Sequence, residues 1–296
     1  MPTLMQEDRK AQDNGRTAAA PNAGRRPRRH HGWRLGGAAL LIAGLAVPSL
    51  ASDASRWATG TPDFEWSGAL KPGQSVEIKG VNGSIIAGKG DKVEIRAWKH
   101  GRRSDPSDVK IELIPHEGGI TVCALYPTPF GSPTNRCEPG EGGHMNTRNN
   151  DVEVRFVVRV PAGVGFVART VNGAVTAIGL TGPTEAYTVN GSVDVATSGR
   201  AEAETVNGSI HAALGITSWS EPVEFKTVNG RIELSVPTGL NADIEASTVN
   251  GSIESDLPFV VHGKIGRSHL RGTINKGGSP LRLETVNGGI RILAGT

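Results

Sequence analysis

The sequence predicts an all-β protein whose strands wind into a single-domain parallel β-solenoid, or β-helix, with coils of roughly 17–22 residues. Three observations predict it. A hexapeptide built on Val-Asn-Gly recurs seven times, apolar and polar residues alternate with period two around it, and turn-rich spacers such as Gly-Leu-Thr-Gly-Pro separate the repeats. The hexapeptides occupy residues 80–85, 170–175, 188–193, 205–210, 227–232, 248–253 and 285–290.

Each repeat supplies one asparagine and one glycine, which we predict to stack from coil to coil. The asparagines are Asn82, Asn172, Asn190, Asn207, Asn229, Asn250 and Asn287. The glycines are Gly83, Gly173, Gly191, Gly208, Gly230, Gly251 and Gly288. Successive asparagines are separated by 90, 18, 17, 22, 21 and 37 residues. We expect the last step to hold two coils, with an atypical one around residues 263–275, and the first to hold about four coils and an insert.

The alternation assigns two faces to each repeat. In residues 205–212 we expect one face to hold Val206, Gly208, Ile210 and Ala212, and the other to hold Thr205, Asn207, Ser209 and His211. Such Thr-x-Asn-x-Ser faces form either a stabilising ladder, which we favour, or a flat lattice that binds extended glycans.

An antiparallel β-meander is the alternative architecture, because Asn-Gly is the commonest two-residue hairpin turn. The solenoid is favoured because a near-identical hexapeptide recurs once per unit, and because stacked asparagines can hydrogen-bond between parallel, in-register strands. In a stack of this kind we expect Asn287, the last copy, to lie at the end.

The N-terminal residues 1–51 have the features of a secretory signal peptide with a long basic leader. Residues 24–34 are rich in arginine, residues 35–50 are apolar but shorter than a membrane span, and Ser49 and Ala51 suit cleavage after Ala51. We therefore expect export to the periplasm, the cell surface or the medium. An uncleaved membrane anchor is the alternative, although the mature domain itself is not expected to span a membrane.

Charge and composition then exclude a nucleic-acid partner. Residues 1–51 contain 8 of the 32 basic and 3 of the 29 acidic residues, which leaves 24 basic and 26 acidic residues and a net charge of about −2. With 40 glycines and only 4% aromatic residues, the interior is expected to be narrow.

The remaining chain is divided into a linker or N-terminal cap at 52–74 and a repeat domain at 75–296 with an irregular insert at 126–150. Trp57, Phe64 and Trp66 either cover the open end of the solenoid, which we favour, or form a sugar-stacking patch. Cys123 and Cys137 are expected to form a disulfide that pins the Pro-rich insert, the alternative being two free thiols. If a ligand site exists, the insert is the first place to expect it.

Catalytic and metal-binding patterns are not evident. Glu233 and Glu254 each follow a repeat asparagine by four residues, so stacking would place their carboxylates about 5 Å apart, as in a retaining glycosidase. Stacked exposed residues on any solenoid reach this distance, so we do not expect catalysis. The histidines lack ligand spacing, and no nucleophile elbow or phosphate loop is present. We expect no cofactor and no metal site.

The repeats resemble the bacterial putative-adhesin domain family, a group of unknown function. The resemblance extends over roughly residues 75–294 and includes RCEPGEGGH at 136–144, NDVEVRFVVRVPAGVGFVARTVNG at 150–173 and GGSPLRLETVNGGIRI at 277–292. It implies an exported β-solenoid at the cell envelope and brings no catalytic residues.

The sequence therefore favours a non-catalytic, adhesin-like structural or interaction module whose partner is an envelope protein or glycan. A glycan or small-ligand binder is the alternative, followed by a polysaccharide-active enzyme.

We predict that the mature protein begins at Ser52, because the basic segment, apolar run and small-residue site together define a cleavage point. Mass spectrometry of the native protein measures its N-terminal residue. Intact residues 24–51 in a membrane fraction would instead establish an anchor.

Overall fold

The computed structural model describes residues 60–262, 266 and 268–295, and within them the protein is all-β. One short 3-10 helix, η1 (Pro106–Asp108), interrupts the strands. No helix in this part of the chain is long and apolar enough to cross a membrane. The predicted signal peptide, its cleavage site and Trp57 lie outside the described residues.

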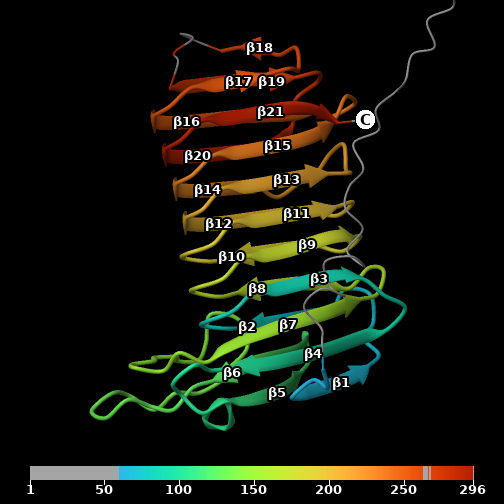
Figure 1. Ribbon diagram of the computed structural model, residues 1–296. Helices are drawn as coiled ribbons and strands as arrows, with labels where there is room; N and C mark the ends of the chain where they lie inside the picture. The colour runs from blue at the N-terminus through green and yellow to red at the C-terminus, as the bar shows by residue number, and fades with distance from the viewer. Residues whose placement is uncertain (1–59, 263–265, 267, 296) are drawn as a thin grey trace, which may run out of the picture. The chain divides into compact units, whose positions relative to one another are not determined.

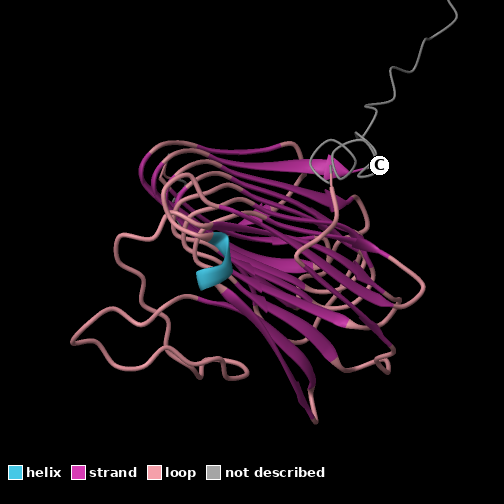
Figure 2. Ribbon diagram, turned by 60° about the horizontal axis from the view of Figure 1, so that its bottom comes forward, coloured by secondary structure: helices cyan, strands magenta, loops and turns pink. Residues whose placement is uncertain are grey.

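The strands form two sheets, A and B (Figures 1 and 2). In spatial order, sheet A contains β1 (Phe64–Gly68), β4 (Val93–His100), β7 (Glu153–Val160), β3 (Ile85–Lys89), β9 (Val175–Leu180), β11 (Val193–Thr197), β13 (Ile210–Leu214), β15 (Ile232–Pro237), β21 (Ile290–Gly295) and β17 (Ile253–Ser255). Sheet B contains β18 (Val260–Val261), β19 (His269–Ile274), β16 (Ala242–Asn250), β20 (Ser279–Asn287), β14 (Val223–Asn229), β12 (Ala201–Asn207), β10 (Thr184–Tyr187), β8 (Gly165–Arg169), β2 (Ser75–Lys79), β6 (Gly119–Leu125) and β5 (Lys110–His116).

The predicted solenoid is confirmed, and the meander is excluded. Each repeat places one strand in sheet B and the next in sheet A, and equivalent strands of neighbouring coils pair in parallel and in register, as β12 does with β10 and β13 with β11. The Asn-Gly dipeptides are corners between the two sheets rather than hairpin turns, because Asn190 bridges in parallel to Asn172 and Asn207. Antiparallel pairs occur toward the two ends, where β4 pairs with β1 and β7, β5 with β6, and β19 with β16 and β18.

The core lies between the two sheets. Inward positions are filled by stacked aliphatic residues such as Ile210, Ile232 and Ile290, each at most 1% exposed. Burying one such side chain stabilises the fold by about 1.5–3 kcal/mol. Larger rings are few and include Phe166 and Phe225, both fully buried.

The predicted assignment of faces is wrong at the corner. Thr205 is 1% exposed and points inward, whereas the following valine points outward in several copies, and Val171, Val189 and Val228 are 37–39% exposed. The reason is that the backbone turns at Val-Asn-Gly, so the alternation of the sheet B strand does not continue into the sheet A strand. The buried hydroxyl is satisfied, because Thr205 Oγ1 donates to the carbonyl oxygen of Gly191 at 2.9 Å. A flat Thr-Asn-Ser lattice is therefore absent from this repeat.

Two further features fix the corner. Asn207 Nδ2 donates to Asn190 Oδ1 at 2.9 Å, and Asn229 Nδ2 donates to Asn207 Oδ1 at 2.8 Å, so the amides form a ladder along the solenoid. A Cβ atom on Gly208 would overlap the carbonyl oxygen of Gly191, because adjacent corners approach each other through their backbones. Only glycine fits there.

The last coil of the chain is not the last coil of the solenoid. Strands β20 and β21 lie between the coil of β14 and β15 and the coil of β16 and β17 (Figure 1). Asn287 donates to Asn229 at 2.7 Å and accepts from Asn250 at 2.8 Å, so Asn250 rather than Asn287 ends the ladder. The expected atypical coil within the 37-residue step is also wrong, because β18 and β19 instead form antiparallel strands beside β16.

The first coil is likewise interior. Strand β2 lies between β6 and β8, and β3 lies between β7 and β9. Asn172 donates directly to Asn82 at 2.9 Å, so the 90-residue step separates adjacent corners and does not hold about four coils between them. Residues between the two corners instead build outward from the first coil, through β6 and β7 to the edge strands.

We predict that Asn207→Ala and Asn287→Ala each lower the free energy of unfolding by about 1–2 kcal/mol, because each removes two ladder hydrogen bonds. Asn250→Ala removes one and should cost about half as much. Urea melts of the three variants measure the difference. A cheaper loss at Asn287 than at Asn250 would contradict the observed order of coils.

Candidate functional site

The irregular insert 126–150 is the largest departure from the repeat, and it folds back against sheet B. Cys137 in the insert forms a disulfide with Cys123 on β6, with a Cα–Cα distance of 5.8 Å. Arg136 and His144 form an isolated antiparallel bridge within the insert. The insert therefore forms a loop attached to the solenoid by a covalent bond, and Figure 1 shows it projecting beside β6 and β8.

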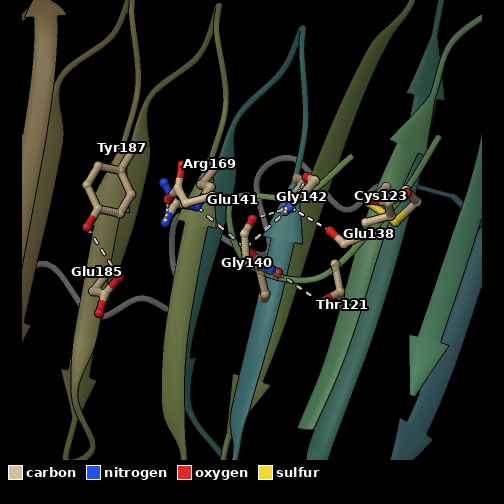
Figure 3. Close-up of polar contacts among 12 residues, drawn as sticks. Thr121, Cys123, Glu138, Gly140, Glu141, Gly142, Arg169, Glu185 and Tyr187 are labelled. Atoms are coloured by element: carbon tan, nitrogen blue, oxygen red, sulfur yellow. Dashed lines mark hydrogen bonds and ion pairs between the residues drawn. A yellow bond between two sulfur atoms is a disulfide. The ribbon is translucent and has the colours of Figure 1, made fainter. Parts of the chain in front are cut away.

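Glu77 on β2 is the centre of the polar contacts beneath the insert. Figure 3 labels three of its partners, Thr121, Gly140 and Arg169. It is only 5% exposed, although it lies on the outward side of the strand, because the insert covers it. Its Oε2 accepts from Thr121 Oγ1 at 2.8 Å and from the backbone N–H of Gly140 at 2.9 Å. Its Oε1 lies 3.5 Å from Arg169 Nε and 3.7 Å from Lys79 Nζ. Both carboxylate oxygens thus contact hydrogen-bond donors or cations.

Lys79 holds the backbone of the insert directly. Its Nζ donates to the carbonyl oxygens of Glu138 at 2.6 Å, Gly140 at 2.5 Å and Gly142 at 3.1 Å. An ammonium group has three donors, and the three carbonyl oxygens, which we call the Lys79 cage, use all of them. We call Glu77, Lys79, Thr121 and Arg169 the insert clamp.

Arg169 connects the clamp to the repeats. Its guanidinium pairs with Glu141 of the insert at 2.8 Å and lies 4.2 Å from the ring centre of Tyr187 on β10. The Tyr187 hydroxyl donates to Glu202 at 3.0 Å and lies within 3.2 Å of Glu185. Burial, followed by the charges of these two carboxylates, raises the pKa of Tyr187 well above its usual value, so it stays protonated at physiological pH.

The two ends of the insert are also fixed. Tyr126 is 2% exposed and its hydroxyl donates to the carbonyl oxygen of Val152 at 2.7 Å, while burial raises its pKa to about 12. The Asn135 side chain donates to the carbonyl oxygens of Tyr126 at 2.9 Å and Asn146 at 2.7 Å. Between these anchors, Phe130 is fully exposed, and it is the most exposed large apolar residue of the described chain.

A pocket of about 230 Å³ lies where the insert meets the corner after β8. Its walls include Arg136, Glu141, His144 and Arg169, so charges of both signs line it. The His144 Nε2 atom is buried and has no hydrogen-bond partner among the residues that the structure describes. Two of the lining residues, Lys79 and Arg169, belong to the insert clamp, so the clamp forms part of the pocket wall.

The predicted carboxylate pair does not form. Arg291 on β21 stands between Glu233 and Glu254 in the sheet register, because the last coil is inserted between their strands. The two glutamates are therefore two coils apart, and the glycosidase-like distance is wrong. Among the described residues, no group of three or more His, Cys, Asp and Glu side chains is arranged to hold a metal ion.

The aromatic residues of the predicted cap are partly described. Phe64 and Trp66 lie on β1, the edge strand of sheet A, and are partly buried against the core. The clamp itself was missed by sequence reasoning. Glu77 and Lys79 alternate with apolar residues in β2, and this pattern is typical of a solvated strand face. The disulfide was the one signal that the insert returns to the sheet.

We predict that Glu77→Gln lowers the free energy of unfolding by about 1–3 kcal/mol, because it removes the buried negative charge that lies beside the half-buried cations Lys79 and Arg169. It should also increase amide hydrogen exchange at Gly140. Glu204→Gln, an exposed carboxylate on the same sheet, serves as the matched control. Unchanged exchange at Gly140 would show that the clamp does not hold the insert.

Comparison with known proteins finds a family model that is similar to the C-terminal repeats. Residues 181–293 match the family model described as Toastrack DUF4097. One similar solved structure is a putative cell adhesion protein from Clostridium sporogenes ATCC 15579, with 13% identity, 79% of this chain and 100% of that chain covered, and a TM-score of 0.42. Another is a putative adhesin from Bacteroides fragilis NCTC 9343, with 9% identity and a TM-score of 0.29. The match covers 78% of this chain and 96% of that chain.

No curated protein matches the chain. The matched residues begin before β10 and run into β21, so they cover the closely spaced repeats together with the inserted last coil. Residues 181–293 of this chain are thus similar to the Toastrack DUF4097 family.

Proposed function

We propose that the chain is a non-catalytic, exported envelope module that binds a partner through the tip of its insert, residues 127–134. The observation that carries this proposal is the full exposure of Phe130 on a loop whose neighbouring residues are fixed. The phenylalanine adds nothing to the core in this place, and its whole ring is available for contact with a partner.

The attachment of the insert favours binding. A flexible loop loses conformational entropy when it binds, at about 0.5–1.5 kcal/mol for each ordered side chain, whereas a loop that is already fixed avoids much of this loss. The disulfide, the Lys79 cage and the Asn135 hydrogen bonds fix the insert before any partner arrives. Proline at positions 127, 129 and 133 restricts the tip further.

The composition of the tip indicates the chemistry of the partner. Residues 127–134 carry no charged side chain and combine Phe130 with prolines and hydroxyl groups. A partner is therefore expected to offer an apolar cleft with hydrogen-bonding groups at its rim. Binding of this kind should depend weakly on salt, because no ion pair at the tip needs screening.

Export is part of the proposal and rests on two features. The leader has the composition of a signal peptide, and a disulfide within the domain suits an oxidising compartment. A module of this kind would act at the periplasmic or outer surface.

A glycan partner is the second candidate, and the same residue favours it. A fully exposed aromatic ring can stack on the apolar face of a sugar, and the hydroxyl groups of Thr128, Ser132 and Thr134 can bind sugar hydroxyls. The two candidates share one surface and differ in the partner, so one experiment separates them.

We predict that Phe130→Ala weakens binding of the purified protein to isolated cell envelopes at least about tenfold and leaves the free energy of unfolding unchanged. Binding is measured by sedimentation with labelled protein. Protease treatment of the envelopes should abolish binding to a protein partner, and glycosidase treatment should abolish binding to a glycan.

Val228→Ala, an exposed apolar residue on a corner, is the matched control and should bind normally. Equal binding by Phe130→Ala and the unchanged protein would contradict the proposed surface. Turnover of an envelope polysaccharide by the protein would contradict its non-catalytic role.

A further inference from the structure

The ladder ends at the coil formed by β16 and β17. The corner of this coil is exposed on its outer side, whereas the corner of every other Val-Asn-Gly coil is covered there by a neighbour. At each corner the glycine N–H donates to the asparagine carbonyl oxygen of the next corner, always in the same direction along the solenoid. Gly230 N–H, for example, donates to the carbonyl oxygen of Asn287, and Gly288 N–H donates to that of Asn250. Asn250 belongs to the final corner of this series, so its own coil has no Val-Asn-Gly neighbour on the outer side.

Among the described residues, three hydrogen-bonding groups on that side consequently lack the partners that their equivalents have. Asn250 Oδ1 has no asparagine donating to it, whereas Asn229 and Asn287 each accept from the next copy. The N–H groups of Gly251 and Ile253 also lack the partners that their equivalents have, because Ile232 N–H donates to Gly289 and Ile290 N–H donates to Ser252. Of the strands that the structure describes, only β21 pairs with β17, so no described strand covers the outer edge of β17.

Apolar exposure follows the same pattern. Val249 is 69% exposed, compared with 37–39% for the equivalent Val171, Val189 and Val228. Ile253 is half-buried, although its equivalents Ile232 and Ile290 are at most 1% exposed. The extra exposure at both positions is therefore the surface that a neighbouring coil would bury.

The open edge is restricted to one sheet. On the sheet B side, β19 pairs with β16, and Thr248 N–H donates to the carbonyl oxygen of Ser268. A polypeptide that joined this end would therefore start at the corner and continue along β17. A groove of about 390 Å³, lined by Asn250, Ser252, Glu254 and Arg291, adjoins this path.

We propose that the edge from Val249 to Ser255 binds an extended polypeptide segment of the type Val-Asn-Gly-x-Ile, which adds in parallel to β17 as one more half-coil. The corners within the protein define this sequence. The incoming asparagine amide donates to Asn250 Oδ1, and its carbonyl oxygen accepts from Gly251 N–H. The residue before the incoming isoleucine accepts from Ile253 N–H, and that isoleucine covers Ile253.

The glycine of the incoming segment is required for a steric reason. At each corner within the solenoid, a Cβ atom on the glycine would overlap the carbonyl oxygen of the preceding corner glycine, as it would for Gly230 against Gly208 and Gly288 against Gly230. An incoming alanine at this place would meet the carbonyl oxygen of Gly251 in the same way. The edge thus selects for Asn-Gly, and it lies in a different part of the fold from the insert.

The test uses the full chain and the fluorescently labelled peptide Val-Asn-Gly-Ser-Ile-His-Ala, the sequence of residues 206–212. Fluorescence polarisation should give saturable binding at or below about 1 mM. Peptides with Asn→Ala or Gly→Ala should bind at least about tenfold more weakly. No binding of the parent peptide, or equal binding of the three peptides, would overturn the proposal.

The protein variant for this test is Val249→Lys, which places a charge on the open edge without altering a buried residue. It should lose the peptide, whereas Val228→Lys, on an interior corner, should retain it. Phe130→Ala should also retain it, so this result is independent of the function proposed for the insert. Equal affinity of Val249→Lys and Val228→Lys would place the peptide elsewhere.

Discussion

The close approach of the Val-Asn-Gly corners is the constraint on which the rest of the structure depends. Backbones of adjacent corners are near enough that a side chain at Gly208 would overlap the carbonyl of Gly191. This proximity brings the asparagine amides into a ladder and places each buried threonine hydroxyl on a glycine carbonyl. The corner therefore sets the register between neighbouring coils, and the strands of both sheets pair in that register.

A register set at the corner explains how the chain can depart from its own order. Because each corner presents the same groups, the last coil fits between β14 and β16 as well as it would at the end. The first coil is interior for the same reason. Outer strands then complete the two ends of the solenoid. The insert departs from the repeat, but the coils remain stacked. The disulfide and the insert clamp attach this irregular loop to the regular sheet.

The fold could be predicted from the repeat, but the order of its coils could not. The hexapeptide and its alternation indicate parallel, stacked strands, because identical residues at Asn207 and its equivalents suit only in-register neighbours. Sequence spacing does not reveal which neighbour is adjacent in space, so Asn287 was placed at the end and Glu233 was placed beside Glu254.

The clamp escaped prediction for a related reason. A loop that lies about 60 residues further along the chain buries Glu77 and partly covers Lys79, and a strand pattern carries no sign of such long-range cover. The inward threonine was also missed, since the alternation breaks at a corner that period-two analysis treats as continuous strand.

The most direct test of this account is a double-mutant cycle between corner asparagines. Alanine substitutions at Asn229 and Asn287 should show a coupling free energy of about 0.5–1.5 kcal/mol in urea unfolding, because the two amides share a hydrogen bond of 2.7 Å. Substitutions at Asn229 and Asn250 should be additive, since the inserted last coil separates them. Coupling between Asn229 and Asn250, with none between Asn229 and Asn287, would contradict the account.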